Sequence, residues 1–157
     1  DVYKRQVFAF AKPVPVYLNN LKHPKRDEVL VSVAGPASNI ALACLAAALM
    51  RLTYGNLYTS MSFAVASQIM NFDATFIVVN LSLAFFNLIP IPPLDGSSII
   101  AAFLSDRALR TYYKVQQYAM FFFLLVILVL PYFLHVNIFG IYLDATAGSI
   151  ARFLLPI

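Results

Sequence analysis

The chain has 157 residues, of which 61% are hydrophobic and 11% are charged, and its mean hydropathy is +0.78. This composition excludes an ordinary soluble globular domain, and the apolar runs approach the length that crosses a bilayer. The net charge is only +4, and the basic residues flank apolar runs, which indicates membrane orientation and argues against a nucleic-acid partner.

The first part of the chain is unlike the rest. Residues 1–6 form a charged hexapeptide without an initiator methionine, and we interpret them as a non-native scar. A genuine polar N-terminus is the alternative. Residues 7–157 are then a fragment of a single membrane-embedded unit that extends upstream. In residues 11–16, AKPVPV, alternating prolines forbid a helix and predict extended backbone at the membrane surface.

Residues 29–52 are the first predicted span. They would reach roughly 36 Å at 1.5 Å per residue, which is enough to cross a bilayer with some tilt. The first half contains small residues such as Gly35, which let transmembrane backbones approach closely. Asn39 is a strongly polar group in mid-helix, and we expect it to hydrogen-bond to another helix.

The next segment, 53–71, holds tyrosines and small polar residues and predicts an interfacial loop or a short amphipathic helix. The second predicted span, 72–89, runs into the sequence NLIPIPPLDG of residues 87–96. Proline removes a backbone donor and clashes with the preceding turn, so the helix must end or unwind near Ile89.

An acid follows these prolines. Unwound backbone at membrane depth survives only where it is buried in protein or lines a polar cavity, and an ionisable residue there is a functional-site hypothesis. Asp95 is therefore the first candidate for chemistry, with Asn87 as its companion. The alternative is a helix end at the membrane interface, with Asp95 and Gly96 as ordinary turn residues.

Beyond the break, a helix is predicted to restart at 97–103, and a basic stretch follows. Residues 116–134 are the third predicted span, and 138–157 predict a short or surface helix because their apolar pattern is interrupted. The fold expected is an all-α integral membrane protein, a polytopic bundle of about three transmembrane helices, one of them broken at the proline-rich Asp-Gly sequence.

The charge pattern predicts an orientation. Basic residues precede the first span and follow the second, whereas the connection between them offers only Arg51. The positive-inside rule then places the N-terminus and the Asp95 loop on the cytoplasmic side of a membrane that we expect to be the plasma membrane.

Residues 87–96 resemble the N-x-x-P-x-x-P-x-D-G motif of the site-2 protease family, the intramembrane zinc metalloproteases. In that family the Asp is the third zinc ligand, and the Asn helps to bind substrate or stabilise the oxyanion. The resemblance implies these two roles for Asp95 and Asn87. Pro90, Pro93 and Gly96 match the motif as residues that determine its shape.

Two further stretches resemble the same family. Residues 34–39, AGPASN, resemble the A-G-P-x-x-N motif of its second core helix. This implies that Gly35 and Pro36 pack closely against the catalytic helices and that Asn39 ties the bundle together near the site. Residues 11–16 resemble a stretch that precedes this helix in one branch of the family.

A catalytic zinc site needs three protein ligands, and H-E-x-x-H usually supplies two of them. This sequence has no such motif, and His23 and His135 are isolated. In the family the motif lies on an upstream helix. We therefore expect zinc only in a longer parent protein and no activity from this fragment alone.

The resemblance implies part of an intramembrane zinc metalloendopeptidase that cleaves membrane-spanning protein substrates in the lipid bilayer, as in regulated intramembrane proteolysis. A catalytically inactive homologue is one alternative. Another is a non-enzymatic scaffold or transporter that uses a broken helix. A transporter is disfavoured because the Pro-Asp-Gly break has no second copy in the chain.

Overall fold

A computed structural model describes residues 24–155, and all of the regular structure in this range is helical. The suspected scar 1–6, the extended segment 11–16 and His23 lie outside the described residues. The elements in chain order are α1 (Pro24–Ser60), α2 (Phe63–Asn87), α3 (Gly96–Phe103), α4 (Asp106–Leu134), α5 (Ile138–Leu143), the π-helical turn η2 (Asp144–Gly148) and α6 (Ser149–Leu154).

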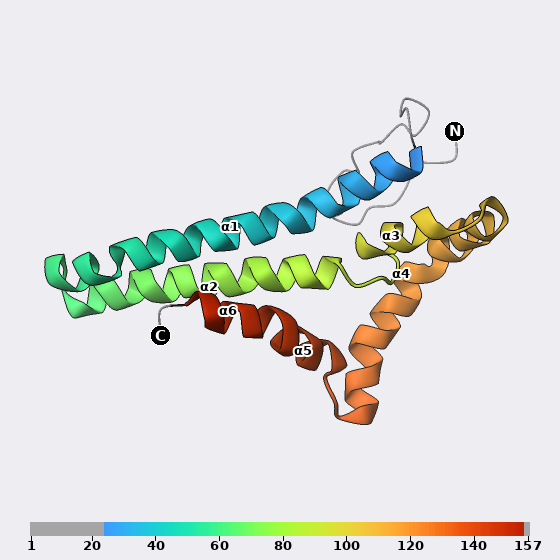
Figure 1. Ribbon diagram of the computed structural model, residues 1–157. Coiled ribbons are helices and arrows are strands. Elements are labelled where there is room, and N and C mark those ends of the chain that lie inside the picture. The colour runs from blue at the N-terminus through green and yellow to red at the C-terminus, as the bar shows by residue number, and fades with distance from the viewer. Residues whose placement is uncertain (1–23, 156–157) are drawn as a thin grey trace, which may run out of the picture.

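The two longest apolar helices form an antiparallel hairpin (Figure 1). Small residues such as Ala43 and Ala47 recur at helical spacing on α1, so they share one face. This face packs against Ile77 and Leu81 of α2, and the core cluster is completed by Ala151 of α6 together with other buried residues. Small side chains on one helix therefore let the two backbones approach closely.

The hairpin is longer than the sequence predicted. Residues 53–71 form no interfacial loop, because α1 continues to Ser60 and α2 starts at Phe63. Polar side chains in this stretch bond back to the helix itself, as Thr53 Oγ1 does to the Leu49 carbonyl at 2.8 Å. The 37 residues of α1 reach about 56 Å, so the helix projects well beyond a hydrocarbon core of about 30 Å.

The third apolar helix, α4, is bent. Its two parts, Arg107–Gln116 and Tyr118–Phe133, meet at 59°. Two described helices are long and apolar enough to cross a membrane, and a third is added if these two parts count as one span. The prediction of an all-α membrane protein with about three spans is confirmed.

The C-terminal segment packs back on the hairpin (Figure 1). Arg51 of α1 donates to the carbonyls of Leu154 at 3.1 Å and Phe153 at 2.9 Å, and the Tyr142 hydroxyl donates to the Phe85 carbonyl at 3.3 Å. The predicted short helix is therefore present, but it is attached to α1 and α2.

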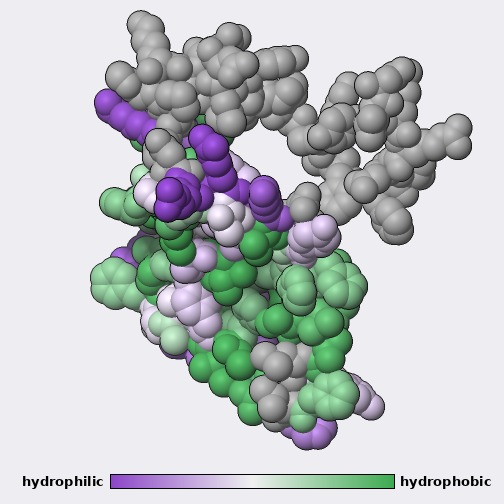
Figure 2. Space-filling model, turned by 90° about the vertical axis from the view of Figure 1, so that its right-hand side faces the viewer, coloured by the Kyte–Doolittle hydropathy of each residue, from purple (hydrophilic) through white to green (hydrophobic). Residues whose placement is uncertain are grey.

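Polar and apolar residues are separated along the molecule. Viewed from the side where α3 and α4 lie, hydrophilic residues gather at one end, and hydrophobic residues cover most of the remaining described surface (Figure 2). The exposed Arg26 and Arg107 lie in the first turns of α1 and α4. These two turns belong to the same end of the bundle, because the Tyr113 hydroxyl of α4 donates to Glu28 of α1 at 3.3 Å.

The break after α2 depends on a close backbone approach. A Cβ atom at Gly96 would overlap the Leu88 carbonyl and would lie 2.7 Å from the Ile89 carbonyl oxygen. Real Cβ atoms essentially never come this close to backbone, so position 96 requires glycine. The start of α3 is thereby held directly against the end of α2.

We expect Gly96→Ala to destabilise the protein by about 1–3 kcal/mol, the usual cost of an added group in a packed site. Gly55→Ala is the matched control, because a Cβ there meets nothing within 4 Å and alanine is favoured over glycine in a helix by about 1 kcal/mol. Thermal unfolding of the purified variants in detergent should lower the midpoint for the first and raise it for the second. Equal midpoints for Gly96→Ala and the unchanged protein would contradict the close approach.

Candidate functional site

Asp95 lies where the loop after α2 enters α3. It occupies the N-cap position of α3 and is half-buried. Its Oδ2 atom is 3.6 Å from the position that a Cβ atom at Gly35 would occupy, so the carboxylate lies close to the backbone of α1 at this glycine. Partial burial removes water from the charged carboxylate, and a bound cation would offset that cost.

Gly35, in the small-residue segment of α1, lies close to this carboxylate. Pro36, next to Gly35, is fully buried inside α1. A residue larger than glycine at position 35 would extend toward the Asp95 oxygen. The structure thus brings Gly35 and Asp95 together across 60 residues of sequence.

Asn39 lies one helical turn after Gly35 and is half-buried. Residues four apart share a helix face, so Asn39 lies on the same side of α1 as Gly35. Within residues 24–155 its side chain makes no hydrogen bond to another helix, so the predicted interhelical bond is not formed there. Its role in tying the bundle together stays a prediction.

Asn87 is the last residue of α2 and is half-buried. Asn87 precedes Leu88, and Asp95 precedes Gly96, so each is one residue away from the contact between Leu88 and Gly96. That contact therefore places Asn87 and Asp95 at the same end of α2. The amide of Asn87 makes no hydrogen bond to another residue in the described part of the chain.

One buried amide was not predicted from the sequence. Asn80 of α2 is 8% exposed, and its Nδ2 donates to the Phe76 carbonyl at 2.8 Å. It precedes Asn87 by about two helical turns and so lies on the same side of α2. The signal that could have identified Asn80 is the same as for Asn39, a single amide side chain within an apolar run.

Two hydrogen bonds hold the start of α3 in place, one made by its own Ser97 and one donated from α4. Ser97 is buried, and its hydroxyl donates to the Leu94 carbonyl at 2.7 Å. The Tyr112 hydroxyl of α4 donates to the Ser97 carbonyl at 3.2 Å. The backbone that carries Asp95 is thus fixed from two directions. No sequence pattern singled out either Ser97 or Tyr112.

Asp95 is a possible metal ligand, but it belongs to no cluster of three or more possible ligands among the described residues. No group of three His, Cys, Asp or Glu side chains comes together between residues 24 and 155 in a way that could hold a metal ion. A catalytic zinc site needs three protein ligands. The described residues therefore supply one candidate ligand and do not form a zinc site by themselves.

Comparison with known proteins gives a consistent result. A family profile described as "Peptidase family M50" matches residues 9–130. "Putative zinc metalloprotease YwhC" of Bacillus subtilis is 36% identical over 119 residues, which cover 74% of this chain and 53% of that protein. "Putative zinc metalloprotease Rip2" of Mycobacterium tuberculosis is 30% identical over 113 residues, which cover 72% of this chain and 40% of that protein.

The chain thus spans about half the length of the curated relatives it matches. No solved structure matches it.

We expect the purified 157-residue chain to retain far less than one zinc ion per molecule, because a single carboxylate cannot hold zinc against water and buffer. Metal analysis after dialysis measures this, and Asp95→Ala is the control, which should give the same low value. One tightly held zinc ion that is lost in Asp95→Ala would contradict the expectation. It would mean that His23 or His135 completes a site.

Proposed function

Because the chain belongs to peptidase family M50, the site-2 protease family, we propose that it is part of an intramembrane zinc metalloendopeptidase. Asp95 is a zinc ligand in this proposal, and Asn87 contacts the substrate. The observation that carries the proposal is the Asp95 carboxylate, held against Gly35 at the broken end of an apolar helix. The activity belongs to the complete protein, because the matched segment covers only 53% and 40% of the two relatives.

The position of Asp95 supports its role as a ligand. Its backbone is fixed by the contact of Gly96 with α2 and by the Tyr112 hydrogen bond to Ser97. A ligand that is held in place by its surroundings binds a metal without a further ordering cost. The remaining ligands would come from an H-E-x-x-H helix in the complete protein. Zinc in such sites polarises the substrate carbonyl and activates a water molecule.

The Asn87 side chain is suited to binding a peptide carbonyl. Its amide has two N–H donors, and no described residue accepts from them. Its place beside the Leu88–Gly96 contact keeps it near Asp95. Donors fixed where negative charge develops stabilise the transition state of acyl transfer. We therefore assign Asn87 to orienting the substrate or stabilising the oxyanion.

The membrane setting points to the class of substrate. An integral membrane protease whose active-site loop lies at the end of an apolar hairpin acts on peptide bonds that reach the same depth. We propose that the substrate is a membrane-spanning protein and that the process is regulated intramembrane proteolysis. The basic residues near the starts of α1 and α4 support a cytoplasmic location for this end of the bundle, and we propose the plasma membrane.

Two other functions make different predictions about the complete protein. A catalytically inactive homologue would lack paired histidines in its upstream helix. A broken-helix scaffold or transporter would lack them too, and it would bind an ion or a partner at the break without cleaving a peptide bond.

The upstream coding sequence tests the proposal first. We expect H-E-x-x-H some tens of residues before Val7, in an apolar run long enough to span, because histidines four apart share a helix face and can both approach Asp95. An upstream helix without paired histidines, or a natural start near Val7, would refute the proposal that the complete protein is an enzyme.

Three variants of the complete protein then separate the roles of the residues. Asp95→Ala should lose both zinc and cleavage, because it removes a ligand. Asn87→Ala should keep zinc and lower kcat by about 10²- to 10³-fold, the usual effect of removing an oxyanion donor. Changing the motif Glu to Gln should keep zinc and abolish cleavage, because this Glu is the base. Full activity in Asp95→Ala would overturn the assignment.

The orientation is tested by cysteine labelling in intact cells. The exposed Cys44 is first replaced by serine. Ser105→Cys should then react from the cytoplasmic side, and Ser60→Cys, in the exposed tip of the hairpin, from the opposite side. Ser97 is unsuitable because its side chain is only 2% exposed. The reverse labelling pattern would contradict the proposed topology.

A further inference from the structure

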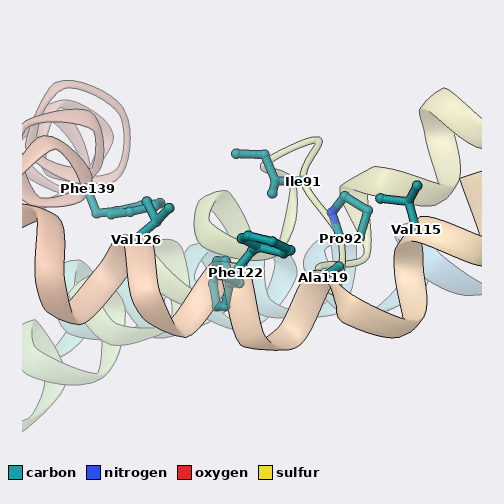
Figure 3. Close-up of a pocket in the computed structure, with 8 residues that line it drawn as sticks. Ile91, Pro92, Val115, Ala119, Phe122, Val126 and Phe139 are labelled. Atoms are coloured by element: carbon teal, nitrogen blue, oxygen red, sulfur yellow. The ribbon is translucent and has the colours of Figure 1, made fainter.

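An apolar groove runs along the proline loop on the side that faces α4. It consists of two adjoining cavities of about 310 and 330 Å³ that share Ile91, Val126 and Phe139. In the first cavity, Ile91 and Pro92 of the loop lie opposite Ala119 and Phe122 of α4 (Figure 3). The second cavity continues along Pro90 toward α5. The loop that carries Asp95 therefore forms one wall of the groove.

The same loop has backbone acceptors that receive no hydrogen bond from the residues that the structure describes. Proline has no N–H, so residues 90, 92 and 93 contribute only carbonyls. No described residue donates a hydrogen bond to any of these three carbonyls, whereas the neighbouring Ile89 and Ile91 carbonyls each accept one. Backbone acceptors at membrane depth need a polar partner, because lipid chains supply none.

We propose that this groove binds the substrate of the protease as an extended apolar segment. The proposal rests on the proposed function and deepens it. Alternate side chains of an extended segment point the same way, so residues i and i+2 would enter the two cavities. The backbone N–H groups of the segment would donate to the free carbonyls of the loop. This combination is typical of peptide recognition by strand addition.

An extended peptide suits this groove better than a lipid chain does. An acyl chain would fill the apolar cavities and leave all three carbonyls unpaired. A helical peptide uses its own N–H groups internally and has none to donate. A segment that has unwound from a membrane helix offers both apolar side chains and free N–H groups. The groove would therefore also stabilise the unwound form of the substrate that a protease must cleave.

The distance to Asp95 places these contacts along the substrate. Pro92 precedes Asp95 by three residues, so their Cα atoms are at most about 11 Å apart at 3.8 Å per residue. An extended peptide advances about 3.3 Å per residue. The first cavity therefore takes a side chain within about three or four residues of the bond cleaved. Each cavity is at the small end of the range for ligand pockets, which suits one large apolar side chain.

Filling the first cavity tests the proposal in the complete protein. Ala119 is buried and lines this cavity, so Ala119→Phe should occupy it. Leu128→Phe is the matched control, because Leu128 is 68% exposed and lines neither cavity. The substrates are one membrane-spanning sequence and a series in which single residues within four positions of the cleaved bond are changed to alanine.

We expect Ala119→Phe to lower kcat/KM at least about tenfold for the parent substrate. Ala119→Phe should lower kcat/KM less than threefold for the one substrate variant in which the residue that enters the first cavity has been changed to alanine. Leu128→Phe should not change kcat/KM for either substrate. Zinc content should stay the same in both variants. Equal losses for every substrate, or no loss, would overturn the proposal.

Photo-crosslinking provides a readout that does not need catalysis or the folding of Ala119→Phe. p-Benzoylphenylalanine at position 122, which lines the first cavity, should crosslink to the substrate, whereas at position 121, which lines neither cavity, it should crosslink to lipid. Crosslinks from position 122 to lipid alone, or to another segment of the same protein, would overturn the proposal that the groove binds the substrate. A complete protein without zinc and cleavage would instead overturn the proposed function, so the two failures are distinguishable.

Discussion

The contact between Gly96 and the end of α2 is the constraint on which the candidate site depends. Because no side chain can stand between position 96 and the Leu88 and Ile89 carbonyls, α3 must begin where α2 ends. The connection between the two helices, residues 88–95, therefore stays directly beside the end of α2. This arrangement places the Asp95 carboxylate close to Gly35 of α1. An alanine at position 35 would make an ordinary van der Waals contact with the carboxylate, so the close approach at position 96 is the one that requires glycine.

The prolines of the loop have two consequences. They end α2, because they cannot donate the backbone hydrogen bonds that a helix requires. They also leave carbonyls that no described residue satisfies, at a depth where an unsatisfied polar group is costly. A soluble protein would satisfy such groups with water at little cost. Under the proposed function the same carbonyls would form a binding edge, because a peptide that has unwound brings free N–H groups.

Local chemistry in the sequence was enough to predict some features and not others. The helix break near Ile89 follows from proline alone, and the packing role of Gly35 stays a prediction from a family pattern. The continuation of the helices through 53–71 was missed, because polar residues there satisfy their hydroxyls on the helix backbone and need no loop. The partners of Arg51 and Tyr112 could not be predicted, since backbone carbonyls far along the chain accept from both, and any residue type can supply one.

These long-range hydrogen bonds also determine where α4 lies relative to the loop. At its first half, α4 is tied to α3 by Tyr112 and to α1 by Tyr113. Beyond its other end, the C-terminal segment is tied to the hairpin by Tyr142 and Arg51. The groove lies between these two attachments, opposite the apolar stretch of α4, where the described contacts are between hydrophobic side chains. Because α4 is attached in its first half and the C-terminal segment beyond it is attached to the hairpin, the apolar stretch of α4 lies opposite the proline loop and forms the second wall of the groove.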